Sequence, residues 1–140
     1  MIFCEDPGVT SASRYLSEHI DLPADRVYEF AADPANLPQW ASGLATTVTK
    51  EGDRWLIGDD GAELIFAPRN DHGVLDHWVR PPGGDEVYAP MRVITAGKDT
   101  SEIMFTLLRL PGMTDEEFDR DAGLVQADLT RLKEIVENAA

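Results

Sequence analysis

The chain has 140 residues, of which 43% are hydrophobic, and a formal net charge of −14. This length predicts one domain that is large enough to bury a core of its own. The charge argues against nucleic acid and anionic membrane surfaces as partners, because the sequence contains no basic patch that could release counterions from phosphates.

Features near the amino end bear on the cellular location. Cys4 is the only cysteine, so the sequence predicts neither an internal disulfide nor a thiolate metal cluster. The first residues lack the basic and apolar regions of a secretory signal, and no apolar run has the length of a membrane span. We therefore expect a cytoplasmic protein without membrane insertion. Residues 1–12 are expected to form a loosely ordered leader, and residues 13–140 a single domain.

The predicted elements begin with a strand over residues 13–20, where polar and apolar residues alternate. Pro23 starts a short helix that runs to residue 32, and Asp33-Pro34 starts a second short helical segment that ends at Trp40. Six strand-like runs follow, separated by turn signals, at residues 44–50, 54–57, 62–68, 74–80, 86–95 and 100–110. Connections this short join antiparallel neighbours.

The last predicted element is a long amphipathic helix after Pro111-Gly112. Thr114 and Glu117 form a capping box at its start. An apolar stripe recurs at steps of four and three, formed by Phe118, Ala122, Val125, Leu129, Leu132 and Val136. A helix of this kind after a series of strands has to lie across a sheet to bury its stripe. We expect a cavity between the helix and a curved sheet, open to solvent at one rim.

Residues 20–40, with the sequence IDLPADRVYEFAADPANLPQW, resemble the start of START-like (SRPBCC) proteins. This superfamily includes birch-pollen allergens, lipid-transfer domains and the bacterial polyketide cyclase/dehydrase group, and the resemblance in element order extends to the carboxyl end. It implies an α+β helix-grip fold: a seven-stranded antiparallel sheet wrapped around the long C-terminal helix, two short helices after the first strand, and a hydrophobic pocket. Because the superfamily contains binders, transporters, cyclases and chaperone regulators, its fold alone does not choose a function.

His77 is the candidate catalytic residue. Neighbouring side chains of a strand point to opposite faces, so Asp76 and His77 cannot form a dyad. Leu75, His77 and Val79 share the more apolar face, which we place toward the helix. There His77 could hydrogen-bond a ligand or act as a general acid or base. The alternatives are a wall histidine satisfied by a backbone carbonyl, or a face assignment that is wrong by one residue.

The next strand extends the same wall. Ala89, Met91 and Val93 are expected to point inward beside His77, which leaves Tyr88 and Arg92 outside, with Arg92 paired to an acid such as Asp76. A shifted register would instead bring Arg92 into the pocket as an anchor for a carboxylate or an enolate. Trp40 and Trp55 could form an aromatic lip, or simply pack in the core. The complete predicted ligand-binding set is Trp40, Trp55, Leu75, His77, Val79, Ala89, Met91, Val93, Phe105 and Ala122.

The sequence predicts neither a metal nor a cofactor. Asp71-His72 and Asp76-His77 lack a third ligand at a suggestive spacing. Motifs for nucleotides, zinc hydrolysis and serine nucleophiles are missing.

Two functional hypotheses follow. The first is a protein that binds a small hydrophobic or aromatic molecule, lipids included, in an internal cavity. A cofactor-independent cyclisation or dehydration of polyketide type, in which His77 moves a proton, would be its catalytic form. The alternative is a non-catalytic protein-interaction or chaperone-regulator module, whose interior would be plugged by Met104, Phe105 and Trp55. A homodimer is a further expectation.

Overall fold

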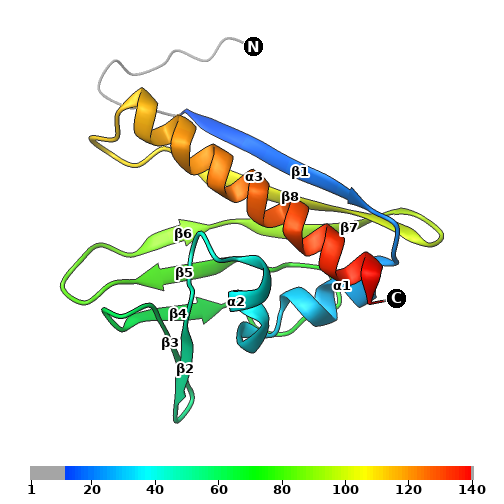
Figure 1. Ribbon diagram of the computed structural model, residues 1–140, viewed down its shortest axis with the longest axis horizontal. Coiled ribbons are helices and arrows are strands. Elements are labelled where there is room, and N and C mark those ends of the chain that lie inside the picture. Colours follow the sequence, from blue (N-terminus) through cyan, green and yellow to red (C-terminus); the bar gives the residue numbers. More distant parts are fainter. Residues whose placement is uncertain (1–11, 140) are drawn as a thin grey trace.

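The computed structural model describes residues 12–139, so Cys4 and nearly all of the expected leader lie outside the described residues. The elements follow the predicted order (Figure 1). They are β1 (Ser13–Ile20), α1 (Ala24–Ala31), the 3-10 helix η1 (Pro34–Asn36), α2 (Leu37–Trp40), β2 (Val48–Glu51), β3 (Arg54–Ile57), β4 (Ala62–Phe66), β5 (His77–Arg80), β6 (Val87–Ala89), β7 (Met91–Gly97), β8 (Thr100–Leu108) and α3 (Asp115–Asn138).

The strands form two antiparallel sheets that meet at Pro90. One sheet has the order β1-β8-β7, and the other has the order β2-β3-β4-β5-β6. The expected single strand over residues 86–95 is divided into β6 and β7, because Pro90 has no N–H to donate to a ladder. When β6 and β7 are counted as one bent strand, the layer has seven strands, as predicted.

Asp76 holds this bend from the neighbouring segment. Its buried carboxylate accepts hydrogen bonds from the Met91 amide and from the Tyr88 hydroxyl, both at 2.9 Å. The Arg92 guanidinium lies 3.9 Å from the same carboxylate on the exposed side. The predicted outward position of Tyr88 and Arg92 is therefore confirmed, and the alternative register with Arg92 in the pocket is wrong.

Two strands begin three or more residues later than the sequence indicated, and β4 and β8 end two residues earlier than predicted. Residues 44–47 do not join β2, because the chain first continues the turn after α2, with the Leu44 and Ala45 amides donating to the Ala41 carbonyl at 2.9 Å. The predicted strand over residues 74–80 begins only at His77, after an isolated bridge between Val74 and Arg92. Both late starts concern segments beside the cavity described below.

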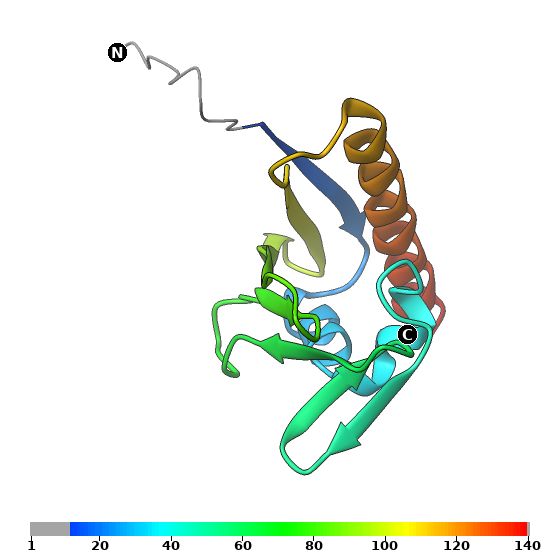
Figure 2. The ribbon, with the colours of Figure 1, turned by 90° about the vertical axis from the view of Figure 1, so that its left-hand side faces the viewer.

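Helix α3 lies on the concave side of the bent strand layer (Figure 2). Its start has the predicted capping box: the Glu117 amide donates to Thr114 Oγ1 at 3.1 Å, and the Thr114 amide donates to Glu117 Oε1 at 2.9 Å. Phe118, Ala122, Leu129, Leu132 and Val136 of the stripe are buried, and Val125 is half-buried. No helix among the described residues has both the length and the apolar character needed to cross a membrane.

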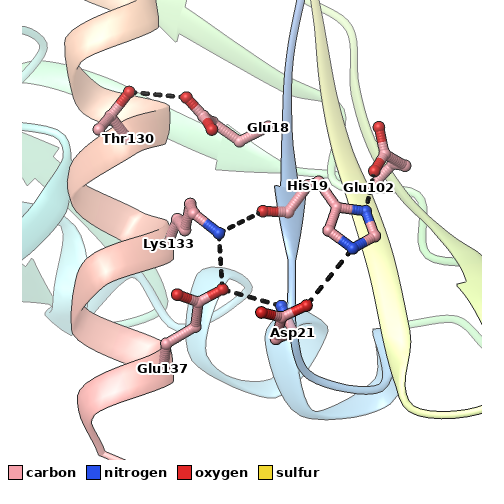
Figure 3. Close-up of polar contacts among 7 residues, drawn as sticks. All are labelled: Glu18, His19, Asp21, Glu102, Thr130, Lys133 and Glu137. Atoms are coloured by element: carbon pink, nitrogen blue, oxygen red, sulfur yellow. Dashed lines mark hydrogen bonds and ion pairs between the residues drawn. The ribbon is translucent and has the colours of Figure 1, made fainter.

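Polar contacts fasten the C-terminal half of α3 to the end of β1 (Figure 3). Lys133 Nζ donates to the His19 carbonyl at 2.7 Å, and Glu137 accepts from the Asp21 amide at 2.8 Å. One turn earlier, Thr130 Oγ1 donates to Glu18 at 2.8 Å. This end of the helix is thereby held against the strand layer.

Candidate functional site

A cavity of about 240 Å³ lies between the N-terminal half of α3, the segment around α2, and strands β5, β6 and β8. Most of its walls are apolar. Leu44 and Leu124 are 38% and 46% exposed, which places them at the mouth. The lining residues are Leu37, Trp40, Ala41, Gly43, Leu44, His77, Val79, Val87, Ala89, Phe105, Leu107, Asp121, Leu124, Val125, Asp128 and Leu129.

His77 is a polar group on this apolar wall, and its side chain is only 4% exposed. Its ring lies between Phe66 and Phe105, with centroid distances of 5.1 and 6.1 Å. Nδ1 is 3.0 Å from the Leu75 carbonyl, which can only accept, so Nδ1 carries the proton. Burial lowers the pKa of His77 below its ordinary value of 6.5. The neutral ring therefore offers Nε2 as a hydrogen-bond acceptor. The ring lines the cavity and also binds a backbone carbonyl, as the wall-histidine alternative expects, and a role of His77 in binding or catalysis stays a prediction.

Asp128 is a second titratable group of the cavity, and sequence reasoning missed it. Its side chain is 13% exposed and accepts from the Gly43 amide at 3.4 Å. A Cβ on Gly43 would lie 3.0 Å from Asp128 Oδ2, so a larger residue there would push the carboxylate away by a few tenths of an ångström. Burial raises the pKa of Asp128, although the Gly43 amide and Arg131 oppose that shift.

Trp40 has a further buried polar atom, the indole Nε1. The side chain is 4% exposed, and Nε1 is buried without a hydrogen-bond partner among residues 12–139. A buried N–H that lacks an acceptor destabilises a fold by about 1–3 kcal/mol. The indole ring lines the cavity, while its N–H is enclosed by protein atoms.

The structure brings together five of the predicted ligand-binding residues: Trp40, His77, Val79, Ala89 and Phe105. The assignment of the other five to the cavity wall has to be corrected; these are Trp55, Leu75, Met91, Val93 and Ala122. Leu75, Met91 and Val93 are buried elsewhere, because the chain leaves the wall before His77 and again beyond Pro90. Ala122 is buried on α3 outside the lining set. Trp55 lies half-buried on the β2–β3 hairpin with the Lys50 ammonium 5.4 Å from its ring centre, so it forms no lip with Trp40.

A sequence signal for the missed helix residues did exist. Asp121, Leu124, Val125 and Asp128 follow spacings of three, one and three, which put them on one face of a helix. That face overlaps the apolar stripe at Val125. Because two aspartates flank the apolar stripe there, the sequence could have predicted that this part of α3 lines a cavity with some polar groups.

A second cavity, of about 450 Å³, lies between α1, the loop over residues 69–73 and β7. Its walls carry charged groups, including Asp25, Glu29, Arg69 and Asp71. Arg69 pairs with Glu29 and stacks 5.3 Å from the ring centre of Tyr28. Asn70 is also occupied, because its side chain bonds to the loop backbone at Pro68, His72 and Val74. The larger space therefore has walls that are polar in part, where Arg69 and Asn70 are already bonded within the protein, and the smaller one has the mostly apolar walls of a ligand site.

Neither a protein-family model nor a curated protein matches the sequence. Solved structures do match. A START superfamily protein from Mycobacterium smegmatis is 12% identical, with a TM-score of 0.63 over 91% of this chain and 99% of that chain. The chain has the START-like, helix-grip fold.

Two other solved structures are similar to the chain over nearly its whole length. The protein XoxI from Bacillus cereus is 13% identical, with a TM-score of 0.68 over 91% of this chain and 97% of that chain. The Zhui aromatase/cyclase from Streptomyces sp. R1128 is 16% identical, with a TM-score of 0.61 over 91% and 94% of the two chains. Likeness at these identities shows the START-like fold, and the function has to be argued from the site.

Proposed function

We propose that this START-like protein binds a small hydrophobic or aromatic molecule in the cavity beneath the N-terminal half of α3. The observation that carries the proposal is the composition of that cavity. Apolar side chains from α2, α3, β5, β6 and β8 form most of the wall, and a buried neutral His77 supplies a polar contact. A concave apolar site with few polar groups is typical of small-molecule binding.

The volume limits the size of the ligand. The cavity of about 240 Å³ lies between an engineered cavity of about 150 Å³ that holds benzene and sites of about 300–1,000 Å³ that hold drug-sized molecules. A molecule with one or two aromatic rings fits this range. Larger molecules would have to project through the mouth at Leu44 and Leu124.

The alternative of a plugged interaction module receives less support from the described residues. Met104 is exposed, and Trp55 lies outside the cavity. Phe105 lines the cavity without filling it. Two of the three expected plugs are therefore absent from the space, which favours a binder over a module with a filled interior.

The binding proposal can be tested by filling the cavity. Val125 is half-buried on the cavity wall, so Val125→Phe would place a ring in the space. Titration of the wild type with naphthalene, followed by calorimetry and by tryptophan fluorescence, is expected to show saturable binding that Val125→Phe abolishes. Ile94→Phe is the matched control, because Ile94 is exposed on β7 and does not line the cavity. Equal binding by both variants would refute the location, and no binding of any one- or two-ring aromatic compound would refute the function.

One observation favours a catalytic form of the same site. His77, on β5, and Asp128, on α3, line one cavity, and burial shifts their pKa values in opposite directions. Groups with a lowered histidine pKa and a raised carboxyl pKa are suited to act as base and acid near neutral pH. The Zhui neighbour is described as an aromatase/cyclase. We infer an intramolecular aldol condensation as the matching reaction class.

The steps of that reaction can be assigned to the two groups. His77 Nε2 would take a proton from a carbon next to a carbonyl, and the enolate carbon would form a bond to a second carbonyl carbon of the same molecule. The resulting alkoxide would take the proton of the Asp128 carboxyl. His77 would then give its proton to the hydroxyl as it leaves, and Asp128 would take the neighbouring carbon-bound proton, which releases water, leaves a conjugated enone and restores both groups. No oxidant or cofactor is needed for this balance.

A simple diketone tests this second candidate. 2,6-Heptanedione closes to 3-methylcyclohex-2-enone with loss of one water, and the enone is detected by its ultraviolet absorbance. Wild-type protein is expected to accelerate the reaction, and Asp128→Asn to lower the rate by about 10²–10⁴-fold, the usual contribution of a positioned acid or base. The control is Asp85→Asn, in an exposed loop. If the protein binds naphthalene but does not form the enone faster than buffer alone, the binding function stands and the catalytic function is refuted.

A further inference from the structure

Most of the large apolar side chains that are exposed among residues 12–139 gather in two places. Leu44 and Leu124 stand at the mouth of the cavity. Four others are close neighbours across β1, β7 and β8, and we call them the outer apolar patch: Tyr15, Ile94, Met104 and Leu108. Tyr15 is 76% exposed and pairs with Thr106, so it lies diagonally between Met104 and Leu108.

The outer apolar patch lies on the strand face that the helices leave uncovered. Strand alternation sends Ile20, Val93 and Ile103 to the opposite face, where they are buried in the core with residues of α1 and α3. Figure 3 shows the His19 ring and Glu102 on the side of β1 that faces away from α3. Among the described residues, no helix packs against this outer face.

The charges of the outer face cancel, in contrast to the rest of the chain. Alternation places two formally charged side chains beside the patch, Arg92 and Glu102, and His19 contacts Glu102. The whole chain has 26 acidic and 12 basic residues. Two copies of so acidic a chain repel each other where acids face acids. A face without net charge is therefore the one through which a second copy can approach.

Pairing of strand edges is less available than packing of the outer faces. β1 is an edge strand of its sheet, but side chains of α3 occupy two of its outward carbonyls. Gln126 Nε2 donates to the Ser17 carbonyl at 3.2 Å, and Lys133 Nζ donates to the His19 carbonyl at 2.7 Å. An edge whose acceptors are occupied is a poor template for another strand. Association through this sheet is therefore expected to use the face.

The size of the face sets the strength of such an association. The longest strand, β8, has nine residues. At about 3.3 Å per residue and about 4.8 Å between strands, the three strands make a face of about 30 by 14 Å. This area of about 400 Å² is roughly half of what each partner of a standard interface buries. The expected complex is therefore weak and reversible.

We propose that the outer apolar patch is a self-association surface, through which two copies of the chain pack face to face in a weak homodimer. The patch supplies the apolar area, and the cancelled charge removes the local repulsion. None of the four patch residues lines the cavity beneath α3. Each copy thus keeps an open cavity, and the dimer does not depend on what the cavity binds.

Sedimentation equilibrium of the full chain tests the proposal. The mean mass should rise from monomer toward dimer between about 5 and 500 μM protein, the range expected for a small interface. Raising sodium chloride from about 0.05 to 0.5 M should strengthen the dimer, because salt screens the repulsion between two acidic chains. A surface that is held together by ion pairs would weaken instead.

Charge substitutions locate the interface. Met104→Glu places a carboxylate in the patch and is expected to weaken association by about tenfold or more. Leu44→Glu is the matched control, because Leu44 has the same exposed fraction, 38%, and the net charge changes equally. Since Leu44 lies at the cavity mouth, this control should leave association unchanged. Tyr15→Ser removes the most exposed ring of the patch without adding charge and should also weaken association.

The outcomes separate the patch from other surfaces. A wild type that stays monomeric at every concentration would refute self-association. A dimer that Leu44→Glu breaks, or that Met104→Glu and Tyr15→Ser leave intact, would place the interface elsewhere and overturn the proposal, as would a dimer that salt weakens. Circular dichroism melting checks that each variant is folded. If Met104→Glu fails to fold, Tyr15→Ser decides the question.

Discussion

Helix α3 meets the strand layer differently along its two halves. In the C-terminal half, Leu132 and Val136 are 0% and 5% exposed and belong to the main core. In the N-terminal half, Leu124 is 46% exposed and Val125 is half-buried beside the cavity. Phe118 and Ala122 are buried in the N-terminal half as well, so the two halves differ at Val125, where the stripe borders the hollow.

The neighbours of the helix explain this difference. At the C-terminal half, α1 packs below the helix with Val27 and Ala31 in the core, and Lys133 and Glu137 bond to the end of β1. At the N-terminal half, the nearest covering helix is α2, which has only four residues. The break at Pro90 also turns β6 away from β7 on this side. Packing therefore varies along a stripe whose sequence pattern is uniform.

The largest expected effect comes from the packed half. Leu132→Ala removes side-chain atoms from a fully buried site, so we expect a loss of about 2–5 kcal/mol in the free energy of unfolding. Leu124→Ala, eight residues earlier on the same helix, is expected to lose far less, because its side chain is 46% exposed. Urea unfolding monitored by circular dichroism measures both. Similar losses would contradict the contrast between the halves.

A substitution of Asp76 is expected to weaken the bend between β6 and β7, which lies beside the cavity. Asp76→Ala leaves the buried Met91 amide and the Tyr88 hydroxyl without their acceptor, so we expect a loss of about 1–3 kcal/mol. The variant should also bind naphthalene less well, since β6 and β7 lose the contact that fixes their angle. Asp85→Ala, at an exposed acid, is the control and should leave the unfolding midpoint unchanged.

A smaller effect is expected at the start of α3, beside the hollow half. Thr114→Ala removes the side-chain acceptor of the capping box, which should lower stability by about 1 kcal/mol. Thr114→Ser keeps the hydroxyl and is expected to restore most of that loss. If the two variants have equal melting temperatures, the cap does not stabilise this end of the helix.

The smallest effect is a dependence on pH that arises from the cavity. Burial lowers the pKa of folded His77 below 6.5, so the unfolded chain binds more protons just below that pH. The part of the free energy of unfolding that depends on a neutral His77 should be fully present above pH 6.5. It should decline as the pH falls from 6.5 toward the lowered pKa of His77 in the folded protein. An NMR titration of the His77 ring gives the folded value directly. A value above 6.5 would contradict the burial argument.

Local patterns of the sequence were sufficient for the order of the elements and for the start and apolar face of α3. Thr114 and Glu117 form their cap within one turn, and the stripe from Phe118 to Val136 needs only the helical period. Strand alternation placed His77 toward the helix and Arg92 on the outer face, because the period of two holds wherever a strand continues. These features depend on residues that are close in the chain.

Only the tertiary structure decided which side chains share the cavity. Trp40 and Asp128 are 88 positions apart and meet because the turn after α2 packs against α3, where the Gly43 amide reaches the Asp128 carboxylate. Met91 and Val93 have the predicted alternation but lie beyond Pro90, outside the cavity. A periodic pattern records which face of an element is apolar. It does not record how far away the facing element lies, because that distance depends on bends and helix lengths elsewhere in the chain.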